Sequence, residues 1–141
     1  MAYIDTSVLT AYYCPEPMSQ KAQAILRNKK PTLSSLTKLE LFSAVAKKVR
    51  TAELAKTDAH RIIAQFSAHV DSGLFVVVAV ENQHWRLARG WLGLFSTALR
   101  TLDALHLAIA SCEELELVTS DKVLYQAGTE LGVMVQFLTN D

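Results

Sequence analysis

Hydrophobic residues along this chain form short apolar runs that alternate with longer amphipathic segments. This alternation is typical of an α/β domain in which helices connect the parallel strands of one sheet. The short runs predict strands at residues 2–5, 32–35, 74–80, 116–119 and 133–138. The amphipathic segments predict helices at residues 7–14, 18–29, 37–49, 53–70, 82–97, 101–113 and 121–131. No repeat, low-complexity stretch or linker interrupts the pattern, so we expect a single domain over residues 1–141.

Three of these helices differ in how they are expected to bury their apolar residues. The segment 102–110 is apolar almost all round, which predicts a central helix. The segment 82–95, with Trp85 and Trp91, holds more apolar residues than one stripe can bury, and Tyr12 and Tyr13 add to them. We therefore expect an exposed apolar patch there that marks a subunit or partner interface. The segment 53–70 predicts one buried stripe at helical spacing, which consists of Ala59, Ile62, Ile63, Phe66 and Val70.

Composition favours a well-packed protein of the cytoplasm. The chain has 141 residues, of which 50% are hydrophobic and 20% charged, so it can bury a core and is not expected to be disordered. No apolar run reaches the roughly 18 residues needed to span a bilayer, and the first residues do not resemble a signal peptide. Cys14 and Cys112 are far apart and form no Cys-x-x-Cys pair, so we expect reduced, non-catalytic thiols.

The net charge is zero, but the charges are segregated along the chain. Residues 21–61 hold ten lysines and arginines against three acids, whereas residues 101–141 hold seven acids against one lysine. A basic flank beside an acidic pocket suits a polyanionic substrate that reacts at metal ions. Solvated helix faces also carry lysine and arginine, so charge alone leaves both interpretations open.

Four acidic residues stand where a predicted strand ends and a helix begins. They are Asp5, Glu40, Asp103 and Asp121. In an open parallel sheet, ligands bind in the crevice beyond the carboxyl ends of the strands, so these side chains could converge on one crevice. Bare carboxylates in close contact repel one another, and a hard divalent cation with oxygen ligands relieves that repulsion. The pattern therefore predicts a metal site.

Helix capping is the alternative explanation for each acid taken singly. Asp, Ser and Thr are favoured at helix starts because they cap free backbone N–H groups. Thr37 and Glu40 also fit the capping-box spacing, which by itself would explain Glu40. Capping does not explain the joint arrangement of the four acids. The neighbouring hydroxyls could cap the helices instead, leaving the carboxylates to face the pocket; these are Thr6, Ser7, Thr119 and Ser120.

Other chemistries have little support in the sequence. The four histidines are scattered, and no His-x-x-x-His or Cys/His cluster suggests zinc. No glycine-rich phosphate loop is present, which argues against a nucleotide cofactor. His106 lies one turn after Asp103 on an apolar helix, where a core histidine with a satisfied hydrogen bond is the expected role.

Four segments of the sequence, taken in order, resemble the signatures of the PIN-domain ribonucleases, and in particular the VapC-type toxins of prokaryotic toxin–antitoxin pairs. They are residues 4–9, 35–40, 102–108 and 117–121. Each motif is weak alone, but the ordered set spans nearly the whole chain and retains an acid at every expected position. Residues 50–100 carry no family signature, so the sequence leaves substrate choice and partner identity open.

The resemblance implies a three-layer α/β/α sandwich with a central parallel sheet. It also implies a cytoplasmic, Mg²⁺- or Mn²⁺-dependent endoribonuclease, usually a homodimer, that a cognate antitoxin inhibits. Asp5, Asp103 and Asp121 would be the metal ligands, and Glu40 would orient the attacking water or bind a second ion. Lysines and arginines of residues 21–61 would hold RNA phosphates.

Two other classes of protein remain as alternatives. A phosphotransfer domain of the receiver or haloacid-dehalogenase kind also uses acids at strand ends. The dehalogenase type has a second Asp two residues after the first, where this chain has Ser7, and a receiver would have to use Glu81. The other alternative is a non-catalytic PIN-like module that binds RNA or protein, against which the four intact acids argue.

Overall fold

Five parallel strands form one sheet in the order β3-β2-β1-β4-β5. The structure, a computed structural model, describes residues 1–140. Its strands are β1 (Ala2–Ile4), β2 (Pro31–Ser34), β3 (Val76–Val78), β4 (Glu116–Thr119) and β5 (Val135–Phe137). Its helices are α1 (Thr6–Tyr13), α2 (Ser19–Asn28), α3 (Ser35–Arg50), α4 (Lys56–Asp71), α5 (Asn82–Leu92), α6 (Thr101–Cys112) and α7 (Lys122–Glu130).

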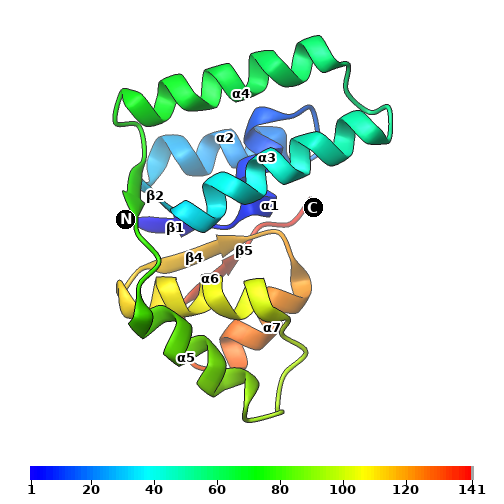
Figure 1. The fold of residues 1–141 in the computed structure, drawn as a ribbon. Helices are drawn as coiled ribbons and strands as arrows, with labels where there is room; N and C mark the ends of the chain where they lie inside the picture. The colour runs from blue at the N-terminus through cyan, green and yellow to red at the C-terminus, as the bar shows by residue number, and fades with distance from the viewer. Residues whose placement is uncertain (141) are drawn as a thin grey trace.

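The helices cover both faces of the sheet. Helices α1–α4 lie on one side and α5–α7 on the other (Figure 1). Successive residues of a strand point to opposite faces, so Ile4 packs against the first group of helices and Tyr3 against the second. Helices therefore cover both faces of the sheet, as is usual for all-parallel sheets, and β1 and β2 are buried throughout. The predicted three-layer architecture is confirmed.

The strand order places a switch point between β1 and β4. From β1 the sheet extends through β2 to β3 on one side and through β4 to β5 on the other. Ligands of open α/β sheets bind at such a point, beyond the carboxyl ends of the strands. The order also differs from the 2-1-3-4-5 order of receiver domains, so the receiver alternative is wrong.

Each predicted strand and helix is present within residues 1–140, but several boundaries differ from the prediction. The strand expected at 74–80 pairs only over Val76–Val78, because β3 is an edge strand with a single neighbour. The helix expected at 82–97 ends at Leu92, and the chain then turns through Phe95, which has a φ of 54°. The capping box expected at Thr37 and Glu40 is wrong: Ser34 caps α3 and pairs with Thr37.

The predicted core positions are largely confirmed. In α4, Ala59, Ile62 and Phe66 are buried, and the two other stripe residues pack partly against the same core. In α6, every residue from Ala104 to Ala110 is buried, so this helix is central. Tyr13 is a correction, because it is buried in the core instead of adding to an exposed patch. Within residues 1–140, every helix is too short or too polar to cross a lipid bilayer.

Gly128 in α7 provides a test of this packing. A Cβ at this position would lie 2.6 Å from Val135 Cγ2 and 2.9 Å from Leu107 Cδ2. We expect Gly128→Ala to lower the free energy of unfolding by about 1–3 kcal/mol, because overpacking outweighs the better helix propensity of alanine. Chemical denaturation measures the change.

Gly90→Ala in α5 is the matched control, since nothing lies within 4 Å of its added Cβ. We expect this variant to be neutral or stabilising by up to about 1 kcal/mol. Equal stability of the two variants would contradict the packing described above.

Candidate active site

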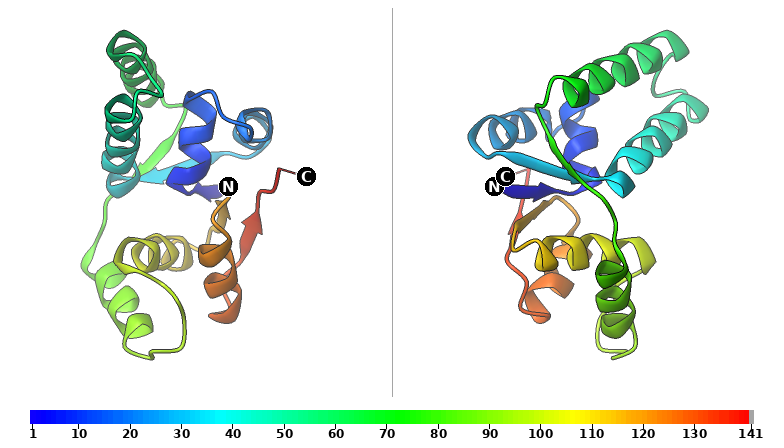
Figure 2. Two further views of the ribbon diagram at one scale, coloured as in Figure 1. Left: turned by 90° about the vertical axis from the view of Figure 1, so that its right-hand side faces the viewer. Right: turned by 60° about the vertical axis from the view of Figure 1, so that its left-hand side comes forward.

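The four predicted acids stand on elements that meet at the carboxyl edge of the sheet, toward which Figure 2 (left) looks. Asp5 directly follows β1 and caps α1, and Asp121 follows β4 and caps α7. Glu40 lies in the second turn of α3, the helix that follows β2. Asp103 lies in the first turn of α6, after the loop of residues 93–100 and not directly after a strand as the sequence suggested.

Hydroxyl groups from β4 and α1 hold the Asp5 carboxylate. The residue is 6% exposed. Its Oδ2 accepts hydrogen bonds from Ser7 Oγ at 2.6 Å and Thr119 Oγ1 at 2.9 Å, and a longer one of 3.4 Å from the Ser7 backbone N–H. No residue in the described part of the chain donates to Oδ1. One oxygen is thus fixed by the protein while the other is free to bind a ligand.

Asp121, like Asp5, has one carboxylate oxygen held by hydrogen bonds and one that is free. Its Oδ1 accepts hydrogen bonds from the backbone N–H groups of Val123, at 2.9 Å, and Leu124, at 3.3 Å. Its Oδ2 has no donor among residues 1–140. The expectation that neighbouring hydroxyls would cap these helices is wrong, because Asp5 and Asp121 are themselves the caps. The hydroxyls of Ser7 and Thr119 instead orient the Asp5 carboxylate.

Glu40 is held by a hydroxyl and an imidazole. Its Oε1 accepts a 2.7 Å hydrogen bond from Thr6 Oγ1 and a further one from His106 Nε2. Burial by itself would raise the pKa of Glu40, but the hydrogen bond and charge of His106, with the bond from Thr6, outweigh burial and lower it. Glu40 is therefore an ionised carboxylate with one oriented oxygen.

His106 connects Glu40 to the interior of the sheet. It is 1% exposed, and its Nδ1 shares a 2.7 Å hydrogen bond with the Tyr3 hydroxyl. That hydroxyl also contacts Ser34 Oγ at 2.8 Å and Thr37 Oγ1 at 3.2 Å. Burial would lower the pKa of His106, but the bond to Glu40 and the nearby carboxylates raise it. The predicted core histidine is confirmed, but the sequence did not reveal that its hydrogen-bond partner is Glu40.

Asp103 has no hydrogen bond or ion pair with any described residue. Burial raises the pKa of its carboxyl group, and the negative charges of Asp121, Asp5 and, more weakly, Glu40 raise it further. Asp103 is therefore within electrostatic range of the three other acids. Asp103 and Glu40 also line one cavity of about 370 Å³, together with Arg100.

Lysine and arginine do not neutralise this group of acids. Within residues 1–140, the ion pairs of these cations involve other acids, and only His106 pairs with a member of the group. Free carboxylate oxygens without a counter-charge suit a hard divalent cation, and hydrogen bonds to the second oxygen are what ligating carboxylates usually have. The donor set therefore fits Mg²⁺ or Mn²⁺. No three His, Cys, Asp or Glu side chains in the described chain already stand close enough to hold an ion, so binding would have to draw the carboxylates together.

The residues that sequence reasoning missed are those that hold the acids in place. Tyr3 was counted only as part of a strand, and Thr6 only as a possible cap. Their role depends on contacts across 34 or more positions of sequence, such as Thr6 with Glu40 and Tyr3 with His106. Local pattern carries no signal for such contacts.

Comparisons with known proteins agree with this architecture. The sequence model of the PIN domain matches residues 2–130. FitAcB from Neisseria gonorrhoeae has 19% identity and a TM-score of 0.69, with 96% of each chain covered. VapC20 from Mycobacterium tuberculosis, a sarcin-ricin loop cleaving toxin, has 18% identity and a TM-score of 0.72, over 91% of this chain and 95% of that one. DNA-bound VapBC from Salmonella typhimurium has 17% identity and a TM-score of 0.66, over 99% and 100%.

These structural similarities establish the fold, and no curated protein matches the chain. The sequence match covers nearly all of the chain and includes the four acids at the carboxyl edge of the sheet. The chain belongs to the PIN domain family.

Proposed function

We propose that this protein is a metal-dependent endoribonuclease that acts as the toxin of a toxin–antitoxin pair. The observation that carries the proposal is the group of four carboxylates near the switch point of the sheet. They have free oxygens and, within residues 1–140, no lysine or arginine partner. Membership of the PIN domain family and the likeness to VapC20, a sarcin-ricin loop cleaving toxin, support it.

In this proposal Asp5, Asp103 and Asp121 hold Mg²⁺ or Mn²⁺ through their free oxygens. When bound, such an ion supplies a Lewis acid that activates water and neutralises the charge that develops on the phosphodiester. Glu40, through its free Oε2, would orient the attacking water or help to hold a second ion. Ser7 and Thr119 keep the Asp5 carboxylate in one orientation, and His106 does the same for Glu40.

An antitoxin and a second copy of the chain are the proposed protein partners. The solved structures that resemble this chain include a toxin–antitoxin complex from Klebsiella pneumoniae. An antitoxin segment would insert an apolar anchor and a basic side chain near the acids. That cation would compensate the clustered carboxylates and compete with the metal, so inhibition would be electrostatic as well as steric. The antitoxin proposal fails if no product of a neighbouring gene binds the protein or suppresses its activity.

Cleavage of RNA by the purified protein tests the catalytic proposal directly. We expect cleavage of single-stranded RNA that requires Mg²⁺ or Mn²⁺ and stops on addition of a chelator. Asp5→Asn should lower the rate by more than about a hundredfold, since loss of a metal ligand exceeds the loss of a residue that only supports one. Gel analysis of end-labelled RNA measures the rate. A wild-type protein that binds RNA but leaves it intact with either metal would favour the non-catalytic alternative.

The thermal stability of Asp103→Asn tests the metal site without reference to activity. The pKa of Asp103 is raised in the folded state, so its ionisation costs stability as pH rises above the unfolded value. At pH 7 we therefore expect metal-free Asp103→Asn to have a higher Tm than wild type. We also expect Mn²⁺ to raise its Tm less, because the variant has lost a ligand. An equal response to Mn²⁺ in both proteins would count against Asp103 as a ligand.

His106 is expected to act as a positioning residue through Glu40. His106→Asn removes the hydrogen bond to Glu40 Oε1. We expect this variant to lose kcat by about 10- to 100-fold, the usual cost of losing a group that orients a catalytic carboxylate. His106→Gln is the control, because its amide can still donate to Glu40 and should recover part of the activity. Steady-state kinetics with a short RNA separates kcat from KM. A purely structural role would lower the Tm of both variants and leave kcat unchanged per folded molecule.

The exposed apolar side chains of α5 and the following loop support the homodimer. Trp85 is 49% exposed and Phe95 is 92% exposed, whereas Trp91 packs partly against the core. We expect a dimer at high micromolar concentration by light scattering, and dissociation in the double variant Trp85→Ser, Phe95→Ser with an unchanged monomer fold. Trp91→Ser is the contrasting variant, which should lower the Tm. A wild-type chain that is strictly monomeric at this concentration would exclude the dimer.

A further inference from the structure

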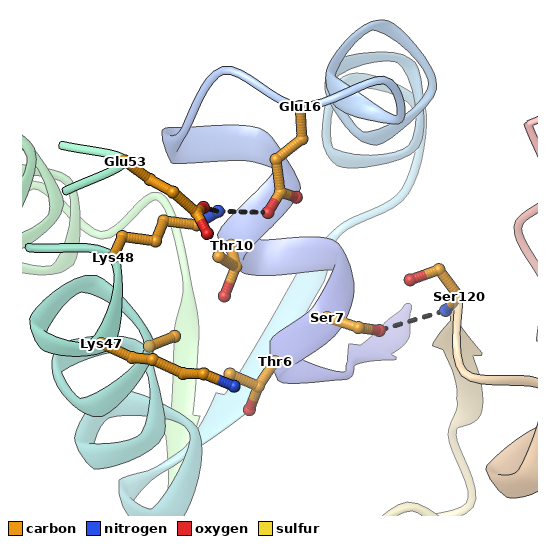
Figure 3. A pocket seen from close by; sticks show the side chains of 9 residues that line it. Thr6, Ser7, Thr10, Glu16, Lys47, Lys48, Glu53 and Ser120 are labelled. Atoms are coloured by element: carbon orange, nitrogen blue, oxygen red, sulfur yellow. Dashed lines mark hydrogen bonds and ion pairs between the residues drawn. The ribbon is translucent and has the colours of Figure 1, made fainter. Parts of the chain in front are cut away.

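A second cavity opens beside the acids, between α1 and α3. Its volume is about 450 Å³. Figure 3 shows hydroxyl side chains of α1 on one wall and the lysines Lys47 and Lys48 of α3 on the other. The proposed catalysis uses neither lysine. The cavity therefore raises the question of what these two cations and the facing hydroxyls bind.

The two lysines differ in their partners. Lys48 Nζ lies 2.9 Å from Glu16 Oε1 and 3.2 Å from Glu53 Oε2, so two carboxylates at the outer end of the cavity already occupy it. Lys47 has no ion pair or hydrogen bond with any residue of the described chain. Figure 3 shows its ammonium group at the other end, toward Thr6. The cavity is polarised, with an available cation at the end nearest the acids.

Thr10 adds an unused hydrogen-bond donor to the same cavity. The residue is 7% exposed and lines the cavity, and its side chain has no hydrogen-bond partner among residues 1–140. In Figure 3 its hydroxyl points into the cavity. Threonine in a helix often satisfies its hydroxyl on a backbone carbonyl one turn earlier, and Thr10 does not. A hydroxyl that opens into a cavity and has no protein partner can donate a hydrogen bond to a bound ligand.

Two residues of the cavity wall directly contact the candidate catalytic acids. Thr6 Oγ1 donates to Glu40 at 2.7 Å, and Ser7 Oγ donates to Asp5 at 2.6 Å. The cavity therefore lies next to the acid site, and the side chains of Thr6 and Ser7 stand between the two. A strand of RNA whose cleaved phosphodiester lies at the acids would place an adjacent nucleotide in this cavity.

We propose that this cavity binds the phosphate group next to the cleaved one in single-stranded RNA, with Lys47 as its cation and Thr10 as a hydroxyl donor. This inference rests on the proposed ribonuclease function and assigns a substrate-binding site to it. A phosphate accepts hydrogen bonds and carries negative charge, which matches the free donor and the free cation. Because these contacts involve the backbone of RNA, they would hold the strand in register without reading its sequence.

RNA binding measured without cleavage tests the subsite. The probe is a fluorescently labelled single-stranded RNA oligonucleotide, and the Asp103→Asn background keeps it uncut. Fluorescence anisotropy over a range of salt concentrations gives the slope of log K against log salt. We expect Lys47→Ala to reduce the magnitude of this slope by about 0.7, the contribution of one phosphate contact on a single strand, with the same effect for different RNA sequences.

Two further variants separate a subsite from a general effect of charge. Lys48→Ala removes the same charge one residue away, and we expect it to leave the slope unchanged because Glu16 and Glu53 already neutralise that lysine. Thr10→Val keeps the shape of the side chain and should weaken binding several-fold without loss of Tm.

The possible outcomes distinguish the subsite from the proposed function. Equal changes of slope in Lys47→Ala and Lys48→Ala would overturn the subsite, because they would indicate attraction by the surface as a whole, while RNA binding by the parent would still support the proposed function. A Thr10→Val variant that binds as tightly as its parent would remove Thr10 from the proposal. A parent protein that does not bind RNA at all would overturn both the subsite and the proposed function.

Discussion

Repulsion between carboxylates is the constraint on which the rest of this structure depends. Asp103 is half-buried and lies close enough to Asp121 and Asp5 for their charges to raise its pKa. Like charges repel more strongly as they approach one another and as burial removes the water that screens them. A fold retains such an arrangement only if other parts of the structure hold the side chains in place. Here the sheet and its helix caps do so.

The support for the acids begins inside the sheet. The Tyr3 hydroxyl is buried and must find partners, which it does in Ser34, Thr37 and His106. His106 in turn forms a hydrogen bond with Glu40. Tyr3 of the central strand β1 thus helps, through His106, to fix the Glu40 carboxylate near the carboxyl edge of the sheet. These groups lie on rigid elements, β1, α3 and α6, and not on loops. This position limits the freedom of the acids before any ligand arrives.

The fold brings part of the basic segment of the chain next to the group of acids. The basic segment 21–61 folds in part as α3, which carries Lys47 and Lys48 along the cavity beside the acids. Lys48 forms ion pairs with Glu16 and Glu53, whereas Lys47 forms none with any residue of 1–140. Neutral net charge therefore conceals a cation and an acidic group placed side by side. Such an arrangement would suit the polyanionic substrate of the proposed ribonuclease.

The sequence by itself determined the order and type of the elements, because apolar periodicity depends on neighbours a few residues apart. It also predicted Asp5, Glu40, Asp103 and Asp121 as a set, on the argument that strand ends of a parallel sheet share one edge. That argument holds for Asp5 and Asp121, whereas Glu40 lies in the second turn of α3 and Asp103 follows a loop. Only the tertiary structure decided which oxygen of each acid is free, because Thr119 and Asp5 are 114 positions apart. The same holds for the difference between Lys47 and Lys48, which are adjacent in sequence and alike in chemistry. Their surroundings differ because, within residues 1–140, only Lys48 forms ion pairs with Glu16 and Glu53 once the chain has folded.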